Sequence, residues 1–266
     1  MRLLLLSLSL LLHYSTASNN FAVIVNTSRY YFNYRHAANA LAVYHSVKAQ
    51  GIPDSNIILM LADDMPCNAR NTIPSQMFTS SDYTQNLYKD VEVDYRGSEA
   101  NVENFIRVLT GRTLPGTPPS QTLPTNENSK ILLYLTGHGG DEFLKFQDSE
   151  EIASNDFAAT FAEMYLKKRY QSMIFIVDTC QAGTLAAQMS QAATPDIFFI
   201  GSSRKDENSY AHHAGKPRSD TRSDTRSDTR SDTRSDTRSE TRSDTRSEPR
   251  SEPRSDTRSA RERDHC

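Results

Sequence analysis

Apolar residues along the chain gather in short uninterrupted runs. These runs cover Phe21–Val25, Ile57–Leu61, Ile131–Leu135, Met173–Val177 and Ile197–Ile200. Continuous apolar runs of this length are typical of strands that are buried on both faces of a parallel sheet. The sequence therefore predicts a core of buried parallel strands.

Helical periodicity separates these runs. Apolar residues recur at helical spacing in segments near residues 36–50, 101–109, 153–170 and 182–193, and Gly51 is placed to stop the first of them. Residues 67–100 are mostly polar, with an alternating stretch at Val91–Tyr95 that indicates a short edge strand or hairpin, and residues 113–129 form a Pro-rich loop. Strands that alternate with helices predict an open, mostly parallel α/β sheet with helices on both faces.

Two of the apolar runs break at residues that carry chemistry. One is followed by Gly137-His138-Gly139-Gly140, and the other ends at Asp178-Thr179-Cys180-Gln181. Because the carboxyl ends of parallel strands lie at one sheet edge, we expect His138 and Cys180 to be neighbours. A thiol nucleophile and its general base need this arrangement, and the amides of Gly139 and Cys180 are placed to form an oxyanion hole. The alternative is that Cys180 is a small buried hydrophobe and His138 an ordinary surface histidine.

Both ends of the chain differ in composition from the middle. Residues 1–18 read as a secretory signal peptide, with Arg2 before a leucine-rich run too short to span a bilayer. Residues 214–266 are mainly a Ser-Asp-Thr-Arg repeat with almost no apolar residues, which predicts a disordered tail rather than a charged helix. The remaining residues, 19–213, form the predicted domain. A formal net charge of −3 argues against a nucleic-acid partner.

The chain has 3 cysteines, an odd number for a secreted protein. With Cys180 assigned to chemistry, Cys67 and Cys266 remain. A leftover thiol of this kind indicates either an intermolecular disulfide or a free, partly buried cysteine.

The two strand-end motifs resemble those of caspase-like cysteine peptidases, and within them the legumain group. Four further blocks are similar to the catalytic subunits of GPI-anchor transamidases: Phe32–His36, Leu61–Asn68, Val91–Arg96 and Phe143–Asp148. The resemblance extends over residues 19–213 and implies a caspase-like fold. Beyond this point the repeat tail stands where that family continues its peptidase domain and adds a membrane helix.

Several residue roles follow from the resemblance alone. It implies a Cys180–His138 dyad, with Asn33 orienting the histidine, and it places Arg35 in the substrate pocket, where the alternative is a solvated helix start. It implies no cofactor for the chemistry but a structural Ca²⁺ site, formed by Asp54, Glu92, Asp94 and the carbonyl of Val25. It also implies that Cys67 forms a disulfide with a partner subunit.

The resemblance implies a transamidase subunit in the lumen of the endoplasmic reticulum, associated with the membrane through the other subunits of its complex. Its substrates would be the C-terminal signal of a proprotein, cleaved through a thioester, and the ethanolamine-phosphate amine of a GPI lipid. Two alternatives remain. One is a legumain-like asparaginyl endopeptidase, in which water is the acceptor, and the other is an inactive truncated paralogue that binds the transamidase partners.

Overall fold

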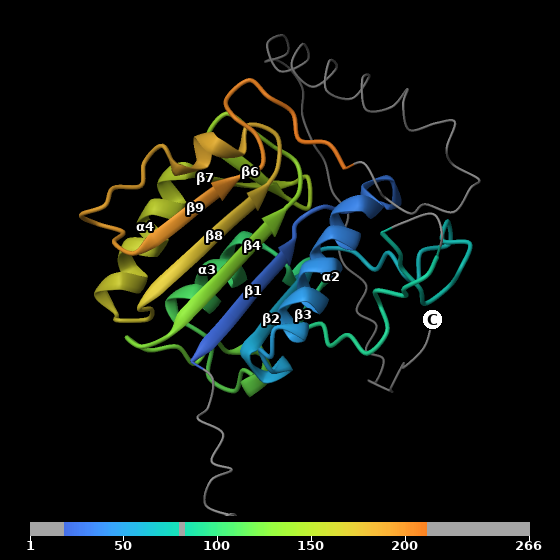
Figure 1. Cartoon of the computed structure of the whole chain (residues 1–266), viewed down its shortest axis with the longest axis horizontal. Coiled ribbons are helices and arrows are strands. Elements are labelled where there is room, and N and C mark those ends of the chain that lie inside the picture. The colour runs from blue at the N-terminus through green and yellow to red at the C-terminus, as the bar shows by residue number, and fades with distance from the viewer. Residues whose placement is uncertain (1–18, 80–82, 212–266) are drawn as a thin grey trace, which may run out of the picture.

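A computed structural model describes residues 19–79 and 83–211 of the chain (Figure 1). The predicted signal segment, the repeat tail and Cys266 therefore lie outside the described residues. Within the described ranges no helix combines the length and the apolar character needed to cross a membrane.

The centre of the structure is a six-stranded sheet with the strand order β3-β2-β1-β4-β8-β9, and every neighbouring pair is parallel. Its strands are β1 (Asn20–Asn26), β2 (Ile57–Leu61), β3 (Tyr95–Arg96), β4 (Lys130–Thr136), β8 (Ser172–Asp178) and β9 (Ile197–Gly201). The predicted α/β class and the buried strands are confirmed. Of the predicted edge strand at Val91–Tyr95, only its last residue enters the sheet.

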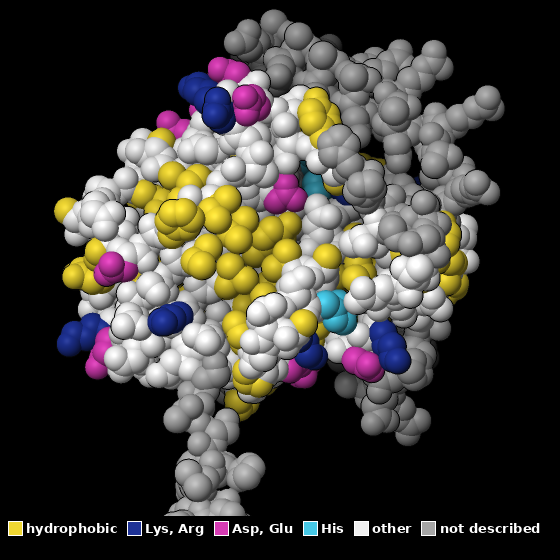
Figure 2. Space-filling model, in the orientation of Figure 1, with side chains coloured by type: hydrophobic (Ala, Val, Ile, Leu, Met, Phe, Trp, Pro, Cys, Tyr) yellow, Lys and Arg dark blue, Asp and Glu magenta, His cyan; other side chains and the backbone are white. Residues whose placement is uncertain are grey.

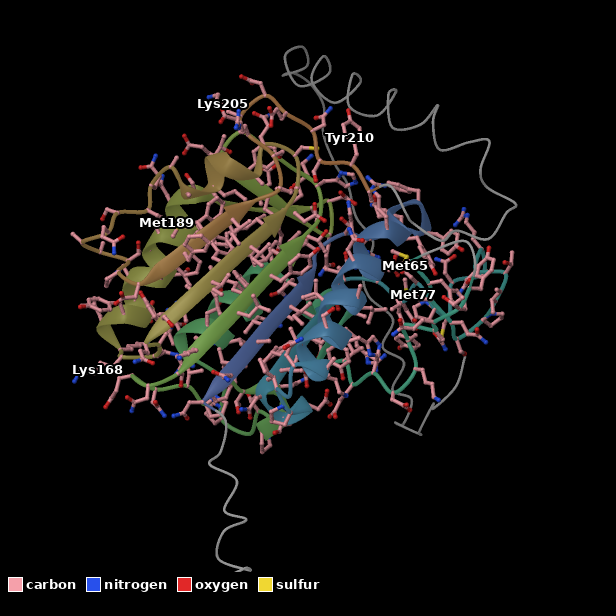
Figure 3. The ribbon with its side chains drawn as sticks, in the orientation of Figure 1. Met65, Met77, Lys168, Met189, Lys205 and Tyr210 are labelled. Carbon is pink, nitrogen blue, oxygen red and sulfur yellow. The ribbon has the colours of Figure 1, made fainter. Side chains whose placement is uncertain are left out.

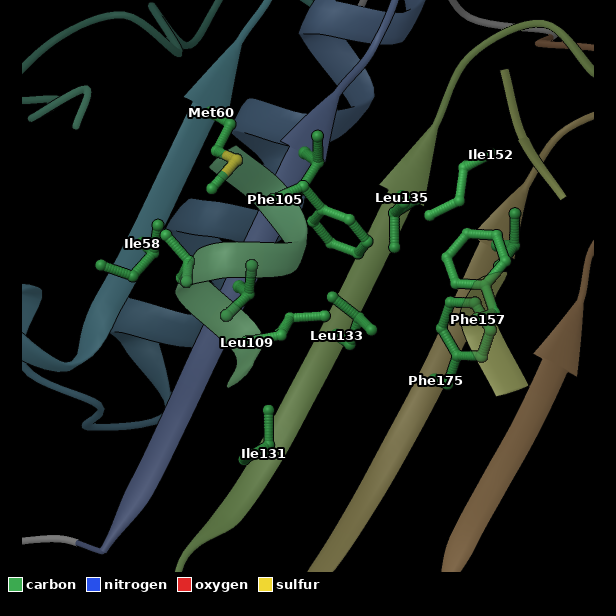
Figure 4. Packing of buried hydrophobic residues seen from close by; sticks show 14 of the residues in the cluster. Ile58, Met60, Phe105, Leu109, Ile131, Leu133, Leu135, Ile152, Phe157 and Phe175 are labelled. Atoms are coloured by element: carbon green, nitrogen blue, oxygen red, sulfur yellow. The ribbon is translucent and has the colours of Figure 1, made fainter. Parts of the chain in front are cut away.

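Helices pack on both faces of this sheet, because alternate residues of each buried strand point in opposite directions. Helix α2 (Tyr34–Ala49) covers one face of β1, β2 and β4, where Ala22 and Ile24 join its cluster. Helices α3 (Val102–Thr110) and α4 (Ser154–Leu166) cover the other face. Figure 4 shows this second cluster, in which Phe157 of α4 packs on Phe175 of β8 with ring centres 5.2 Å apart.

Three short strands that the sequence pattern does not reveal follow β4. They are β5 (Gly139–Gly140), β6 (Phe143–Phe146) and β7 (Glu150–Ala153), paired antiparallel in a small sheet. Short 3-10 helices occur at Tyr31–Asn33, Asp54–Asn56, Gly97–Glu99, Pro119–Gln121 and Ala182–Ala186.

The last of these corrects the helix predicted at residues 182–193. Only the first turn forms, and the rest of that segment is turns. The amide of Ala182 donates to the hydroxyl of Ser203, and that of Gly183 donates to the carbonyl of Ser203. These bonds tie the segment to the loop after β9, so tertiary contacts override its helical propensity.

The face of the sheet that α2 covers is open over β8 and β9. Figure 2 shows a continuous apolar surface there. Its most exposed side chains are Ile174 at 45%, Phe198 at 66% and Ile200 at 42% of their full accessible area. The helical cover of this face therefore ends at β4.

Candidate active site

The two strand-end motifs meet at the carboxyl edge of the sheet. Strands β4 and β8 are direct neighbours, with Thr136 paired to Asp178. His138 and Cys180 follow these paired residues at the same distance along each strand, and the amide of Gly137 donates to the carbonyl of Asp178 at 3.3 Å. The side chains of His138 and Cys180 line one cavity. Residues far apart in sequence thus come together where the strand pattern predicts.

Asn33 holds the histidine from the side of α2. Its Nδ2 donates to the carbonyl of Arg29 at 2.6 Å, so Oδ1 is the atom that lies 2.8 Å from Nε2 of His138. An amide oxygen is only an acceptor, and Nε2 must therefore carry the proton. The lone pair of the neutral ring is then on Nδ1, which is the nitrogen left to act as a base.

This geometry predicts the effect of changing Asn33. In Asn33→Ala the tautomer and orientation of His138 are no longer fixed, and we expect alkylation of Cys180 by iodoacetamide at pH 7 to slow by roughly 10- to 100-fold. Peptide-resolved mass spectrometry measures the rate at Cys180 alone. Asn33→Asp keeps the acceptor and should retain most of the rate, and the exposed Asn128→Ala is a control. Labelling of a folded Asn33→Ala protein at the original rate would contradict the assigned role.

Two backbone amides are available for an oxyanion. The amide of Lys145 donates to the carbonyl of His138, which makes these two residues a hydrogen-bonded pair between antiparallel strands. The next pair, Gly139 and Leu144, is therefore a non-hydrogen-bonded pair, and its amides point away from the partner strand. The amide of Thr179 donates to Ser202 and that of Gln181 to Glu207, whereas the amide of Cys180 has no acceptor among the described residues. The amides of Gly139 and Cys180 are thus both free of the ladders, as an oxyanion hole requires.

Gly139 also lets the two motifs approach each other. A Cβ at this position would lie 2.6 Å from Oγ1 of Thr179 and 2.7 Å from the carbonyl oxygen of Phe143. Thr179 is buried, and its hydroxyl has no hydrogen-bond partner among the described residues. Only a glycine leaves room for the residue before the nucleophile to pack against the residue after the base.

The cavity wall also contains residues for which the sequence pattern predicts no role. Besides the predicted Arg35, it is lined by His36, Asn39, Asp178, Ser209 and Ala211. Oδ1 of Asp178 accepts from the hydroxyl of Ser209 at 2.8 Å, and Oδ2 accepts from Nδ2 of Asn39 at 3.1 Å. The cavity therefore has a guanidinium and a hydrogen-bonded carboxylate in its wall. The segment from Lys205 to Tyr210, labelled in Figure 3, runs along this edge of the molecule.

His36 lies directly behind the base. Its Nδ1 is 2.7 Å from the hydroxyl of Ser28, and its ring meets that of His138 edge-to-face with centres 5.1 Å apart. Burial lowers the pKa of His36 well below its ordinary value, and the charges of Arg35 and His138 lower it further. His36 is therefore a neutral ring at pH 7. Its position immediately after Arg35 was the only hint in the sequence.

The carboxylates of the implied calcium site lie beyond β2, apart from the dyad. Interaction with Asp54 raises the pKa of Glu92 above its ordinary value, and Oδ2 of Asp94 accepts from the amide of Leu59 at 2.9 Å. The described residues nevertheless contain no group of three or more acidic, histidine or cysteine side chains arranged to hold a metal ion. The Ca²⁺ site stays a prediction for these three residues.

Val25 does not belong to that group. The carbonyl of the next residue, Asn26, accepts from Ala62 on the β2 side, and carbonyls alternate along a strand in a parallel sheet. The carbonyl of Val25 therefore faces β4, away from the three carboxylates. Its assignment as a ligand is corrected.

The raised pKa of Asp94 predicts that the stability of the folded chain depends on pH. Burial, together with the charges of Glu92 and Asp54, raises the pKa of Asp94 from 3.8 to about 7. Between these values the folded chain binds more protons than the unfolded chain, so the free energy of unfolding falls as pH rises from 4 to 7. At about 1.4 kcal/mol per pKa unit, the loss is on the order of 3 kcal/mol.

Asp94→Asn keeps the acceptor for Leu59 and removes the charge. We expect it to leave Tm unchanged near pH 4 and to raise it by several degrees at pH 8, in Ca²⁺-free buffer. Thermal unfolding followed by circular dichroism at both pH values measures this. A Tm gain of the same size at pH 4 and pH 8 would contradict the raised pKa.

The structure also places Cys67 and Asn26. Asn26 is the first residue of Asn26-Thr27-Ser28, which is formally a sequence for N-glycosylation. Cys67 is exposed and disulfide-bonded, and the intersubunit pairing implied by the resemblance stays a prediction. Cys180 is the free cysteine among the described residues. Asn26 is fully buried, and its Nδ2 donates to the carbonyl of Ser28, so its side chain is inaccessible to glycosylation in the folded protein.

The cavity brings together the Cys180 thiol, the His138 imidazole that Asn33 orients, and two backbone amides that donate to no strand. This set of groups defines a cysteine-nucleophile enzyme of the open α/β class. Comparison with known proteins agrees with this class. The model of the peptidase C13 family matches residues 20–240, which is most of the chain. The chain belongs to the peptidase C13 family.

Several similar proteins are named more specifically, as GPI-anchor transamidases. The chain is 56% identical over 201 residues to the GPI-anchor transamidase of Saccharomyces cerevisiae, covering 75% of this chain and 48% of that protein. It is 50% identical over 213 residues to that of Schizosaccharomyces pombe (80% and 55%) and 53% identical over 196 residues to that of Homo sapiens (73% and 49%). The chain spans about half the length of the curated relatives it matches.

Proposed function

We propose that this chain is the catalytic subunit of a GPI-anchor transamidase. One observation carries the proposal: the sequence identity to proteins of that name extends across the site. A match of 201 residues within a chain of 266 must include both His138 and Cys180, whatever its starting point. The family alone is compatible with peptidases and transamidases, and the named relatives favour the transamidase.

The first half of the proposed reaction is acylation of Cys180. His138 takes the thiol proton at Nδ1, and the sulfur attacks the carbonyl carbon of the amide at the attachment residue of the proprotein. The amides of Gly139 and Cys180 donate to the tetrahedral oxyanion. The C–N bond then breaks, His138 returns the proton to the leaving amine, and the C-terminal signal departs from a thioester on Cys180.

The second half transfers the acyl group to the ethanolamine-phosphate amine of a GPI lipid. The amine attacks the thioester carbonyl, the C–S bond breaks, and His138 accepts a proton from the amine and returns it to the thiolate. In a legumain-like endopeptidase, water would take the place of the amine. Exclusion of water from the thioester separates the two reactions, and in the proposed complex this depends on the partner subunits.

The proposal extends to partners and location. We infer assembly with the other transamidase subunits in the endoplasmic reticulum. Cys67 is the proposed attachment point for an intersubunit disulfide, which would form by exchange of the disulfide that Cys67 makes in the structure of this chain alone. Cys67 is exposed, as such a bond requires. In this proposal, membrane association comes through the other subunits of the complex.

Complementation tests this function. The chain is expressed in cells that lack their own transamidase catalytic subunit, and surface GPI-anchored proteins are counted by flow cytometry. We expect rescue by the intact chain and none by Cys180→Ala at equal expression. Failure of the intact chain to rescue, despite normal expression and recovery of the partner subunits with it, would contradict the proposal.

The choice of acceptor, an amine or water, distinguishes a transamidase from the alternative of a legumain-like endopeptidase. With a peptide substrate and hydroxylamine as a small amine, a transamidase should give mainly the hydroxamate, and an endopeptidase mainly the free acid. Mass spectrometry of the products distinguishes the two. Free acid as the main product at saturating hydroxylamine would favour the endopeptidase.

A further inference from the structure

One hydrogen bond fixes the tip of the His138 ring but not the plane of the ring. Oδ1 of Asn33 lies 2.8 Å from Nε2, which is at the far end of the ring from the Cβ–Cγ bond. The torsion about that bond has a broad energy profile in histidine. Because Nε2 lies closer to the rotation axis than Nδ1 does, a turn of the ring moves Nδ1 more than it disturbs the bond to Asn33. A second contact is therefore needed to direct Nδ1 at the sulfur of Cys180.

The ring of His36 makes such a contact. It meets the ring of His138 edge-to-face, with ring centres 5.1 Å apart and planes inclined by 77°. Aromatic rings prefer this arrangement because the positive edge of one ring lies against the negative face of the other. A turn of His138 about its Cβ–Cγ bond would tilt the two rings out of it. His36 is thus placed to hold the ring plane that Asn33 leaves free.

His36 is itself held from the end of β1. Its Nδ1 lies 2.7 Å from the hydroxyl oxygen of Ser28, and both side chains are buried. Ser28 is fixed in turn, because its amide donates to Oδ1 of Asn26 at 3.2 Å and its side chain lies beside Gly137. A continuous set of contacts therefore runs from a buried strand end through Ser28 and His36 to the ring of His138.

The charge state of His36 suits the neighbour of a base. The charged and titratable side chains that line the cavity are those of Arg35, His36, His138, Asp178 and Cys180. Burial holds the pKa of His36 well below its ordinary value, and the charges of Arg35 and His138 lower it further, so the ring stays neutral. A neutral ring does not repel the positive charge that His138 gains with the thiol proton, whereas a protonated ring would.

We propose that His36 is a positioning residue, which Ser28 holds and which fixes the plane of the His138 ring so that Nδ1 faces the thiol of Cys180. In this role His36 acts through His138 rather than on the reacting atoms. The inference rests on the dyad of the proposed function, but it concerns only the removal of the thiol proton. It therefore applies whether the acceptor is an amine or water.

Alkylation of Cys180 by iodoacetamide tests this role without a substrate. The rate is measured at pH 7 by peptide-resolved mass spectrometry, on variants whose thermal unfolding shows that they are folded at the assay temperature. We expect His36→Ala to slow alkylation by about 10-fold, as the loss of a residue that orients a functional side chain does. His36→Phe keeps a ring against His138 and should retain most of the rate, although it gives up the bond to Ser28 and some stability.

A second histidine of α2 provides a matched control. His45 is partly buried, its Nε2 lies 2.7 Å from the carbonyl oxygen of Leu87, and it is not among the residues that line the cavity. His45→Ala should also lower Tm, but it should leave the alkylation rate unchanged. A loss of rate in His45→Ala equal to that in His36→Ala would show that loosening of the helix is the cause, and it would overturn the proposal.

The variant Ser28→Ala tests whether the hydroxyl acts through His36. Alone it should slow alkylation by about 3-fold, and added to His36→Ala it should cause no further loss, because its effect requires the ring. A further loss in the double variant would contradict this link.

Two other results would overturn the role of His36. One is labelling of folded His36→Ala at the original rate, and the other is a loss of rate in His36→Phe as large as that in His36→Ala. Neither result depends on acyl transfer. An unchanged rate in His36→Ala leaves the proposed function standing, and failure of the chain to complement leaves the alkylation results intact, so the two failures are distinguishable.

Discussion

We expect Cys180→Ala to abolish the proposed amide cleavage and acyl transfer, with a loss of at least about 10⁴-fold in kcat/KM, because the proposed thioester forms on the Cys180 sulfur. Cys180 is half-buried and lines an open cavity. Its replacement therefore leaves no closed void, and we expect Tm to change by less than about 2 °C. Activity with a peptide substrate and thermal unfolding of the same preparation measure the two effects separately.

The pairing with His138 makes this prediction sharper. The effects on rate of substituting residues that act as a unit are not additive. We therefore expect His138→Ala to lower kcat/KM nearly as much as Cys180→Ala, and the double variant to be no slower than either. Lys205→Ala, which removes an exposed ion pair with Asp141 at the same edge of the sheet, is a control that should keep full activity. Cleavage by Cys180→Ala at more than about one hundredth of the original rate would place the nucleophile elsewhere.

Gly137→Ala is expected to have the largest effect on the fold around the site. A Cβ at this position would lie 2.0 Å from Oγ1 of Thr27, on the neighbouring strand end, and 3.3 Å from Oγ of Ser28. Thr27 and Ser28 are buried, so neither can move aside freely. Overpacking of this kind costs on the order of 3 kcal/mol, and the shift it forces on His138 should lower activity by about 100-fold.

The structure supplies a matched test of that cause. Thr27→Ala removes the clashing oxygen and gives up one hydrogen bond, from its hydroxyl to the carbonyl of Thr136 at 3.3 Å. Alone it should cost about 1 kcal/mol. Combined with Gly137→Ala it should restore much of the lost stability, with a favourable coupling of about 1–3 kcal/mol. Additive effects in urea unfolding of the double variant would show that the clash is not the cause.

The elements that carry the dyad were predictable because their sequence signals are local. The run Ile131–Leu135 is too short and too uniformly apolar for an amphipathic helix, and the glycines after it mark its end. The same holds for Met173–Val177 before Asp178. Once both are parallel strands, the adjacency of His138 and Cys180 follows from topology alone.

The features of the fold that could not be predicted from the sequence depend on tertiary contacts. The segment at residues 182–193 has good helix formers, yet bonds from Ala182 and Gly183 to Ser203 stop the helix after one turn. The contact between Ser209 and Asp178 depends on the path of the loop after β9, which no periodicity encodes. The strands β5 to β7 were missed because they are short and interrupted by turns, which gives them too few residues for an alternating pattern.

The resemblance to the family implies residue roles that the residue pattern alone does not. The structure shows which of these residues lie at the site. Asn33 lies against His138 and Arg35 lies in the cavity wall, so both are at the site. Val25 is one strand away from the acidic residues with which it was grouped. A ligand assigned through a backbone carbonyl is the hardest to transfer by sequence, because its direction depends on strand register rather than residue type.

In the proposed mechanism, Cys180 carries the acyl group as a thioester. This can be measured by incubating the intact chain with a proprotein-derived peptide, followed by acid quenching and peptide mass spectrometry. We expect a mass increase on Cys180 equal to the acyl part of the substrate, its removal by hydroxylamine as the hydroxamate, and its absence in Cys180→Ala. A substrate cleaved with no adduct on Cys180 at any quench time, or an adduct on another residue, would contradict it.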